Sequence, residues 1–131
     1  MIKDAPTKVI DDVGQEYDPT DVVGYMENTY PEMTSEFKKI QRDQYELFCR
    51  KQYDYGPQNI AVGTILKTPE DIKLSLLGIW FRMNDKIERM KTLLMRNGEN
   101  SVEGEPVTDS FSDVSNYGVM AQVVARGKWA K

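Results

Sequence analysis

Acidic side chains recur at helical spacing in two stretches of the chain. Asp85 and Glu88 lie one helical turn apart, and Asp109 and Asp113 lie four residues apart. If two antiparallel helices carry them, the four carboxylates converge, and such a cluster raises its own pKa values unless a cation lies within it. Carboxylate oxygens suit Mg²⁺ or Mn²⁺, which keep positions for water and phosphate. The pattern therefore allows a metal site, with four solvent-exposed acids as the alternative.

Basic and amide side chains surround these acids. Arg82, Lys86 and Arg89 accompany the first pair along one helix, and Asn116 and Met120 continue the stripe of Asp109 and Asp113. Arginine and lysine bind phosphate. The two helices together therefore offer both metal ligands and phosphate ligands.

A second candidate lies at the end of an earlier predicted helix. The stretch contains Lys51, Tyr53, Asp54, Tyr55 and Gly56, and Asn59 follows it. Lysine can bind a phosphate, the acid and amide offer a polar edge, and tyrosine rings can stack on a base. The alternative is an ordinary helix C-terminus with packed tyrosines.

The composition restricts the class of protein. The chain has 131 residues, which suits one domain, and its formal charge of −4 argues against direct nucleic-acid binding. The absence of histidine excludes Ser-His-Asp triads and His-ligated zinc. The single Cys49 cannot form an internal disulfide, and its apolar neighbours predict a buried, inert thiol. With no signal peptide and no membrane-length apolar run, we expect a cytoplasmic protein without membrane contact.

Turn and capping signals divide the chain into an N-terminal arm, residues 1–30, and a helical domain, residues 31–131. The arm is expected to contain a short strand near residues 8–10 and a brief helix near residues 22–26. One long helix begins after Pro31, capped by Thr34 or Ser35, and stops near residue 55. Gln58 to Gly63 form a helical turn or short helix. Two more long helices are predicted from Pro69 to about residue 97 and from Val107 to Ala125. The fold class is therefore an all-α bundle of three main helices with short helices and an arm.

Apolar and small residues at three- and four-residue steps predict which faces of the last two helices are buried. Gly78 suggests a close approach of another element. The expected core positions of the two helices are Ile72, Leu76, Ile79, Met83, Ile87, Met90 and Leu94 on the first, and Val107, Phe111, Val114, Gly118, Ala121 and Ala125 on the second.

Three motifs together resemble a known family. They are Lys51-x-x-Asp54-Tyr55-Gly56, Arg82-Met-x-Asp85-Lys86-x-x-Arg89 and Asp109-x-x-x-Asp113-x-x-Asn116-Tyr117. In this order and at these separations they resemble the phage family called nucleotide modification associated domain 1, which is distantly similar to MazG-like all-α nucleotide pyrophosphatases. The resemblance covers roughly residues 36–125.

The resemblance implies a nucleotide ligand, a homo-oligomer and, for a phage protein, the host cytoplasm. MazG-like enzymes hold Mg²⁺ with two pairs of acids. Asp85 and Glu88 stand where the first pair would be, and Asp109 and Asp113 replace the second pair at a different spacing. One hypothesis is thus a Mg²⁺-dependent nucleotide pyrophosphohydrolase with Asp85 and Asp113 as catalytic residues. A second is an anti-defence protein that sequesters a host nucleotide signal without turnover. A third is a structural or partner-binding helical protein with no affinity for nucleotides.

Overall fold

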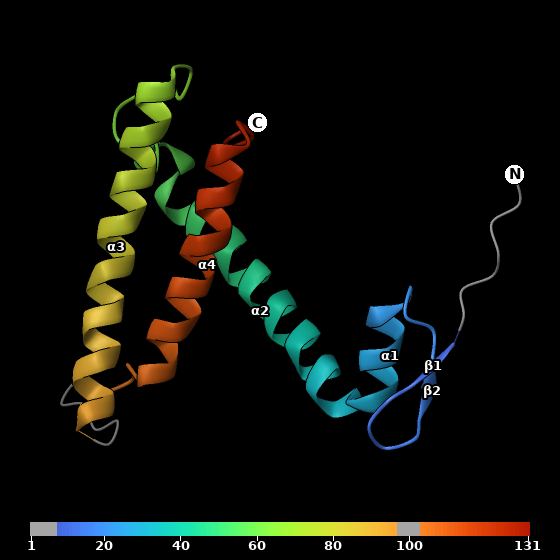
Figure 1. Cartoon of the computed structure of the whole chain (residues 1–131). Coiled ribbons are helices and arrows are strands. Elements are labelled where there is room, and N and C mark those ends of the chain that lie inside the picture. Colours follow the sequence, from blue (N-terminus) through green and yellow to red (C-terminus); the bar gives the residue numbers. More distant parts are fainter. Residues whose placement is uncertain (1–7, 97–102) are drawn as a thin grey trace, which may run out of the picture. The chain divides into compact units, whose positions relative to one another are not determined.

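The computed structural model describes residues 8–96 and 103–131, and Figure 1 shows the order of their elements. The predicted all-α class is confirmed, because the only sheet in the described residues has two short strands. The elements are β1 (Val9–Ile10), β2 (Glu16–Tyr17), α1 (Val22–Thr29), α2 (Pro31–Tyr55), the 3₁₀ helix η1 (Pro57–Asn59), α3 (Pro69–Met95) and α4 (Val107–Ala125). None of the helices in this part of the chain has the length and apolar character needed to cross a membrane.

The chain forms two compact units, Met1–Asp43 and Gln44–Lys131, which divide within α2. The first unit contains the two strands, α1 and the start of α2. The second contains the end of α2, η1, α3 and α4. The boundary predicted between residues 30 and 31 stays a prediction.

The hairpin of the first unit is held by one carboxylate. β1 and β2 pair antiparallel, with Val9 opposite Tyr17. In the turn between them, the carboxylate of Asp11 accepts hydrogen bonds from the backbone N–H of Val13 and Gln15 and from the hydroxyl of Tyr25 on α1, at 2.5 Å. The hydrogen bond from Tyr25 lowers the pKa of Asp11 and raises the pKa of the tyrosine. A polar contact thus fastens α1 to the hairpin.

Local capping chemistry explains the starts of α1 and α2. The side chain of Asp21 accepts from the N–H of Gly24, so α1 begins where the sequence predicted a brief helix. The predicted start of α2 was wrong, because the helix begins at Pro31 itself. Proline suits a first turn, where no N–H partner exists. Thr34 lies inside the helix, and its hydroxyl donates to the carbonyl of Tyr30 instead of capping.

The helix boundaries in the second unit follow the predicted signals. α2 ends at Tyr55, and Gly56 then takes a left-handed backbone with φ of 75°. A capping box between Thr68 and Asp71 starts α3. The predicted end of α3 at residues 97–98 lies outside the described residues. α4 spans Val107–Ala125, as predicted.

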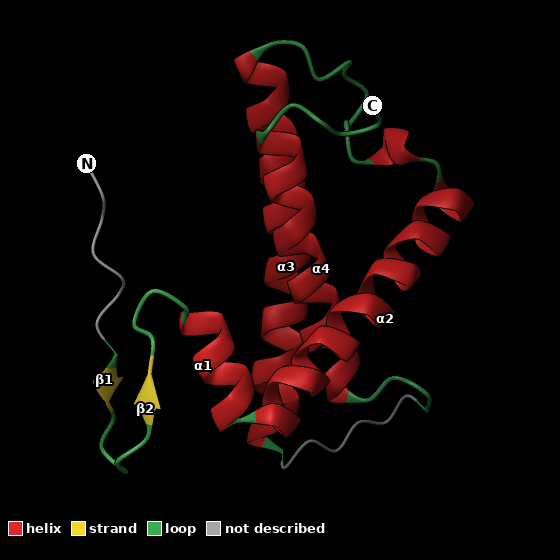
Figure 2. Ribbon diagram, turned by 90° about the vertical axis from the view of Figure 1, so that its right-hand side faces the viewer, coloured by secondary structure: helices red, strands yellow, loops and turns green. Residues whose placement is uncertain are grey.

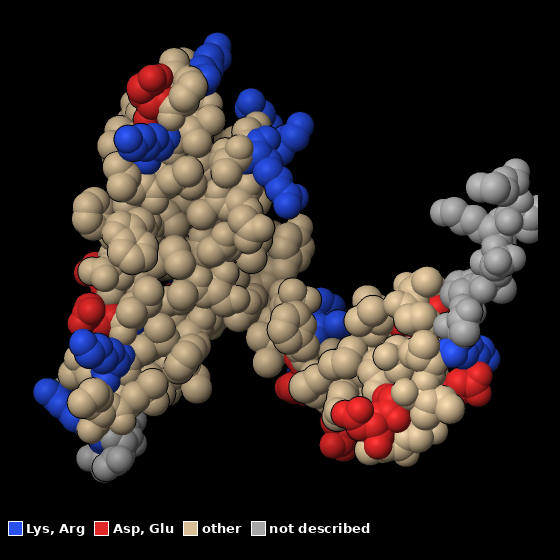
Figure 3. Space-filling model, viewed as in Figure 1, with Lys and Arg blue, Asp and Glu red and all other residues tan. Residues whose placement is uncertain are grey.

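α3 and α4 pack antiparallel along much of their lengths (Figures 1 and 2). The buried core cluster draws on the loop after η1, on both helices and on the C-terminal tail; its members are Ile60, Ile79, Met120, Val124 and Trp129. The space-filling view shows few charged groups over the middle of the α3–α4 face (Figure 3). Burial of this apolar cluster between the two helices, the loop and the tail stabilises the unit.

Several predicted core positions were wrong. On α3, Leu93 is buried while Leu94 is exposed. On α4, Ser110, Met120 and Val124 are the buried residues, whereas Phe111 and Ala125 are exposed. The prediction followed small and apolar residues, but the buried face of α4 includes a serine that accepts a hydrogen bond from Arg89. A polar residue with a partner can occupy a core position at little cost.

Two further expectations concern small side chains. Cys49 is exposed rather than buried, because the faces of α2 that contact the rest of this unit exclude it. The expected close approach at Gly78 is confirmed, since a Cβ there would lie 3.3 Å from Cγ2 of Val62. Gly118, by contrast, has open space beside it, because a Cβ there would meet no atom within 4 Å.

Gly118→Ala is therefore expected to stabilise the protein by about 0.5–1 kcal/mol, since glycine inside a helix costs about this much relative to alanine. Chemical denaturation with circular dichroism would measure the change. Gly78→Ala is the matched comparison, and it should gain less because its new methyl group presses on Val62. An equal or larger gain at Gly78 would contradict this reading of the two positions.

Candidate functional site

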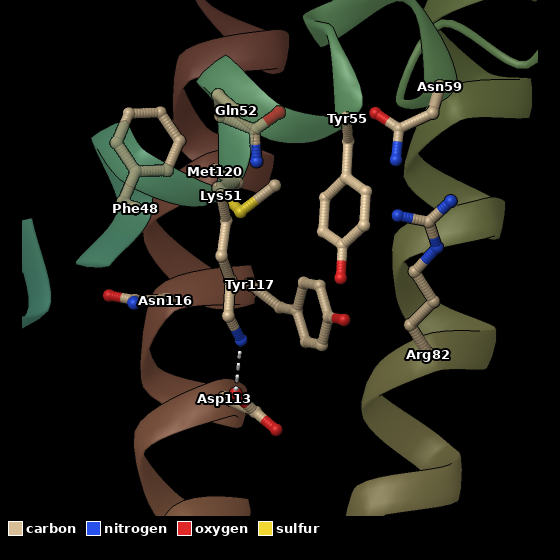
Figure 4. A pocket seen from close by; sticks show the side chains of 10 residues that line it. All are labelled: Phe48, Lys51, Gln52, Tyr55, Asn59, Arg82, Asp113, Asn116, Tyr117 and Met120. Atoms are coloured by element: carbon tan, nitrogen blue, oxygen red, sulfur yellow. Dashed lines mark hydrogen bonds and ion pairs between the residues drawn. The ribbon is translucent and has the colours of Figure 1, made fainter.

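A pocket of about 80 Å³ lies within the second unit, and Figure 4 shows the side chains around it. Its walls come from α2, from η1 directly after it, and from α3 and α4 further along the chain. The lining residues are Phe48, Lys51, Gln52 and Tyr55 from α2, Asn59 from η1, Arg82 from α3, and Asp113, Asn116, Tyr117 and Met120 from α4. Seven of these ten residues belong to the set that the sequence motifs predicted.

Helical spacing places the side chains on each wall. On α2, residues 48, 51, 52 and 55 follow steps of three and four, so they share one face. On α4, residues 113, 116, 117 and 120 do the same. The Nδ2 of Asn116 donates to the backbone carbonyl of Gln44 at 3.2 Å. This hydrogen bond fixes Asn116 between the two helices, which makes it a structural tie as well as a lining residue.

Asp113 links three helices through two ion pairs. Its Oδ1 lies 3.3 Å from Nζ of Lys51 on α2, and its Oδ2 lies 3.1 Å from Nζ of Lys86 on α3. Figure 4 shows Lys51 extending along the pocket wall to reach this carboxylate. Lys86, by contrast, is absent from the pocket lining. Each oxygen of Asp113 is thus occupied by a different ammonium group.

Arg82 has no hydrogen bond or ion pair with any residue in ranges 8–96 and 103–131. Its guanidinium reaches toward Asn59, next to the ring of Tyr55 (Figure 4). A guanidinium offers five N–H donors in a planar fork that matches phosphate or carboxylate. The pocket therefore contains an unpaired, permanently charged donor group.

Gln52 adds a second unpaired polar group. Its Oε1 is buried and has no hydrogen-bond partner among the described residues. A buried acceptor without a donor costs about 1–3 kcal/mol. A ligand N–H or O–H group that reached this amide would recover part of that cost.

Some predicted binding residues lie elsewhere. Tyr53, at 89% exposure, and Asp54 point away from the rest of the unit, and Gly56 ends α2 without lining the pocket. The guanidinium of Arg89 binds the hydroxyl of Ser110 at 2.5 Å and the carbonyl of Glu105. These bonds tie the end of α3 to the start of α4, so the structure gives Arg89 a role in packing.

Of the four predicted magnesium ligands, only Asp113 lines the pocket. Asp85, Glu88 and Asp109 are exposed and absent from the pocket lining. In residues 8–96 and 103–131, no three acidic or cysteine side chains gather closely enough to hold a metal. Asp113 would have to give up a lysine to bind one. Binding of Mg²⁺ therefore stays a prediction.

Two lining residues were not predicted, Phe48 and Gln52, whereas Met120 lies on the predicted stripe of α4. Helical spacing was the available signal, because Phe48 lies three residues before Lys51 and Gln52 lies four residues after Phe48. Extending the first motif by one turn towards its N-terminus would have found Phe48. Gln52 lies inside that motif, three residues before Tyr55 and on the same helix face.

Comparisons of this chain with protein-family models, with curated proteins and with solved structures give no match.

Proposed function

We propose that the second unit binds a nucleotide, with a phosphate in the pocket of Figure 4 and without hydrolysing it. The observation that carries this proposal is the unpaired guanidinium of Arg82 in a pocket that also holds Lys51 and two tyrosine rings. The motif resemblance stated above favours a nucleotide over other anions.

The charge of the pocket favours an anion. Arg82 and Lys51 line it, and Lys86 pairs with Asp113, so the pocket and its border hold three cationic side chains and one carboxylate. Arginine binds phosphate oxygens through two parallel hydrogen bonds, which fixes their orientation as well as their charge. The phosphate is the part of a nucleotide that satisfies both basic lining residues.

The size of the pocket determines how much of the ligand it encloses. Sites that bury a drug-sized ligand measure roughly 300–1,000 Å³, whereas this pocket measures about 80 Å³. The phosphate end therefore lies inside, and the sugar and base lie across the opening. Tyr55 is 69% exposed and offers its ring there for stacking, a contact worth about 1–3 kcal/mol.

Binding without turnover is the better-supported alternative, because the acids expected to hold a catalytic metal do not line the pocket. Asp85 is exposed, and both oxygens of Asp113 are paired with lysines. The predicted catalytic roles of these two residues stay predictions, as does the homo-oligomer. A protein of this kind would sequester a nucleotide.

Calorimetry with a panel of nucleoside mono-, di- and triphosphates and cyclic nucleotides tests the proposal, once with Mg²⁺ and once with EDTA. We expect saturable binding that does not require metal, and chromatography should recover the ligand intact. Turnover that requires Mg²⁺ and is lost in Asp85→Ala would support the pyrophosphohydrolase instead. No binding of any nucleotide would contradict both functions.

A further inference from the structure

Asp113 is the one acidic side chain among the described residues that line the pocket, and its two oxygens bind different cations. Lys51, on one oxygen, lines the pocket, while Lys86, on the other, does not. The carboxylate therefore has one lysine that an entering ligand can reach and one that lies behind it.

An anion that enters the pocket must compete with Asp113 for Lys51. The lysine is able to move, because its side chain is 43% exposed and its contact with the carboxylate, at 3.3 Å, is the longer of the two. Loss of Lys51 is unfavourable for Asp113, because the side chain of this aspartate is only 18% exposed. A partly buried carboxylate that loses its partner is destabilised.

Lys86 reduces the cost to Asp113 of losing Lys51. It contacts the second oxygen of Asp113 at 3.1 Å, so the carboxylate keeps a counter-ion when Lys51 leaves. We propose that Lys51 exchanges between Asp113 and the phosphate of the bound nucleotide, while Lys86 remains on Asp113 and makes the exchange favourable. This inference rests on the proposed function and assigns a positioning role to a lysine outside the pocket.

The exchange also indicates a class of ligand. A phosphate that carries more charge than the carboxylate competes more effectively for Lys51. A terminal phosphate carries about −1.5 to −2 at pH 7, whereas the diester of a cyclic nucleotide carries a single charge. The preferred ligand is therefore a nucleotide with a terminal phosphate.

A double-mutant cycle tests the exchange, with adenosine monophosphate, cyclic adenosine monophosphate and inorganic phosphate as calorimetric probes. Removing the competitor in Asp113→Asn is expected to tighten monophosphate binding about fivefold, the equivalent of one partly exposed ion pair. Lys86→Met is expected to weaken it by about the same factor. The double variant should bind the monophosphate at least as tightly as the wild type does. It has no carboxylate at position 113, so no counter-ion is needed there.

Each variant and each probe can contradict the proposed exchange. Weaker binding by a folded Asp113→Asn would mean that this carboxylate contacts the ligand or its metal. A double variant as weak as Lys86→Met would mean that Lys86 binds phosphate directly. If Asp113→Asn does not fold, the Lys86→Met variant still tests the proposal. Unchanged affinity of Lys86→Met for the monophosphate would contradict the exchange of Lys51. Equal affinity for the cyclic and terminal phosphates overturns the ligand class, whereas no binding by any variant counts against the proposed function itself.

Discussion

Arg82→Ala is expected to weaken nucleotide binding by about 10- to 100-fold, because hydrogen bonds to charged groups contribute roughly 1.5–3 kcal/mol. The guanidinium has no hydrogen-bond or ion-pair partner among the described residues, so its removal breaks no such bond there. The free energy of unfolding should therefore change little. Calorimetry with the tightest-binding nucleotide, together with a thermal melt of each protein, measures both effects.

Two variants make this result specific. Arg82→Lys keeps the charge but loses the planar fork, so it should recover only part of the affinity. Arg50→Ala removes an arginine from the exposed side of α2, where it pairs with Glu46 at 2.8 Å, and it should leave binding unchanged. Equal losses in Arg82→Ala and Arg50→Ala would show that only net charge matters. An unaltered affinity in Arg82→Ala would place the phosphate elsewhere.

Trp129→Ala is expected to destabilise the protein by about 3–5 kcal/mol, the usual cost of removing a large buried aromatic side chain. The indole is 6% exposed and belongs to the core cluster. Its ring meets Phe48 edge to face at 5.9 Å, and its Nε1–H donates to the carbonyl of Pro57 at 2.8 Å. This one side chain thus joins the C-terminal tail to α2 and to η1.

Trp80→Ala is the matched control, because this tryptophan lies on α3 with 51% exposure. Chemical denaturation of both variants should show a much smaller loss at Trp80 than at Trp129. Trp129→Phe separates the two contributions: it keeps most of the apolar contact but leaves the Pro57 carbonyl without its donor. Similar losses in the two alanine variants would mean that the tail does not form part of the core.

Trp129 also connects stability with the site. Phe48 packs on the indole on one side and lines the pocket on the other. Loss of the indole removes the support behind this wall, so Trp129→Ala should weaken nucleotide binding as well as the fold. Trp80→Ala should leave binding unchanged.

Local signals in the sequence were sufficient for most of the secondary structure. Thr68 and Asp71 start α3 through contacts within one turn, and Gly56 ends α2 because glycine accepts a left-handed backbone. Such effects depend on neighbours along the chain, so they can be read without a structure. The predicted start of α2 was wrong because Pro31 and Thr34 both suit the beginning of a helix, and local preference alone does not distinguish them.

Core positions were harder to predict, because burial depends on which neighbour a helix face meets. Ser110 is buried since Arg89 donates to it, and Cys49 is exposed although apolar residues precede it. The burial of Trp129 depends on the tail folding back to a carbonyl more than 70 residues earlier. None of these contacts leaves a periodic signal in the sequence.

The same distinction holds for the candidate site. The sequence by itself determined the all-α class, the faces of α2 and α4 that carry Lys51, Tyr55 and Asn116, and the presence of basic residues on α3. Only the tertiary structure decided that Asp113 is paired with two lysines while Arg82 has no partner in the described chain. Spacing shows which side chains share a helix face, but the distance between charges on different helices depends on how those helices pack.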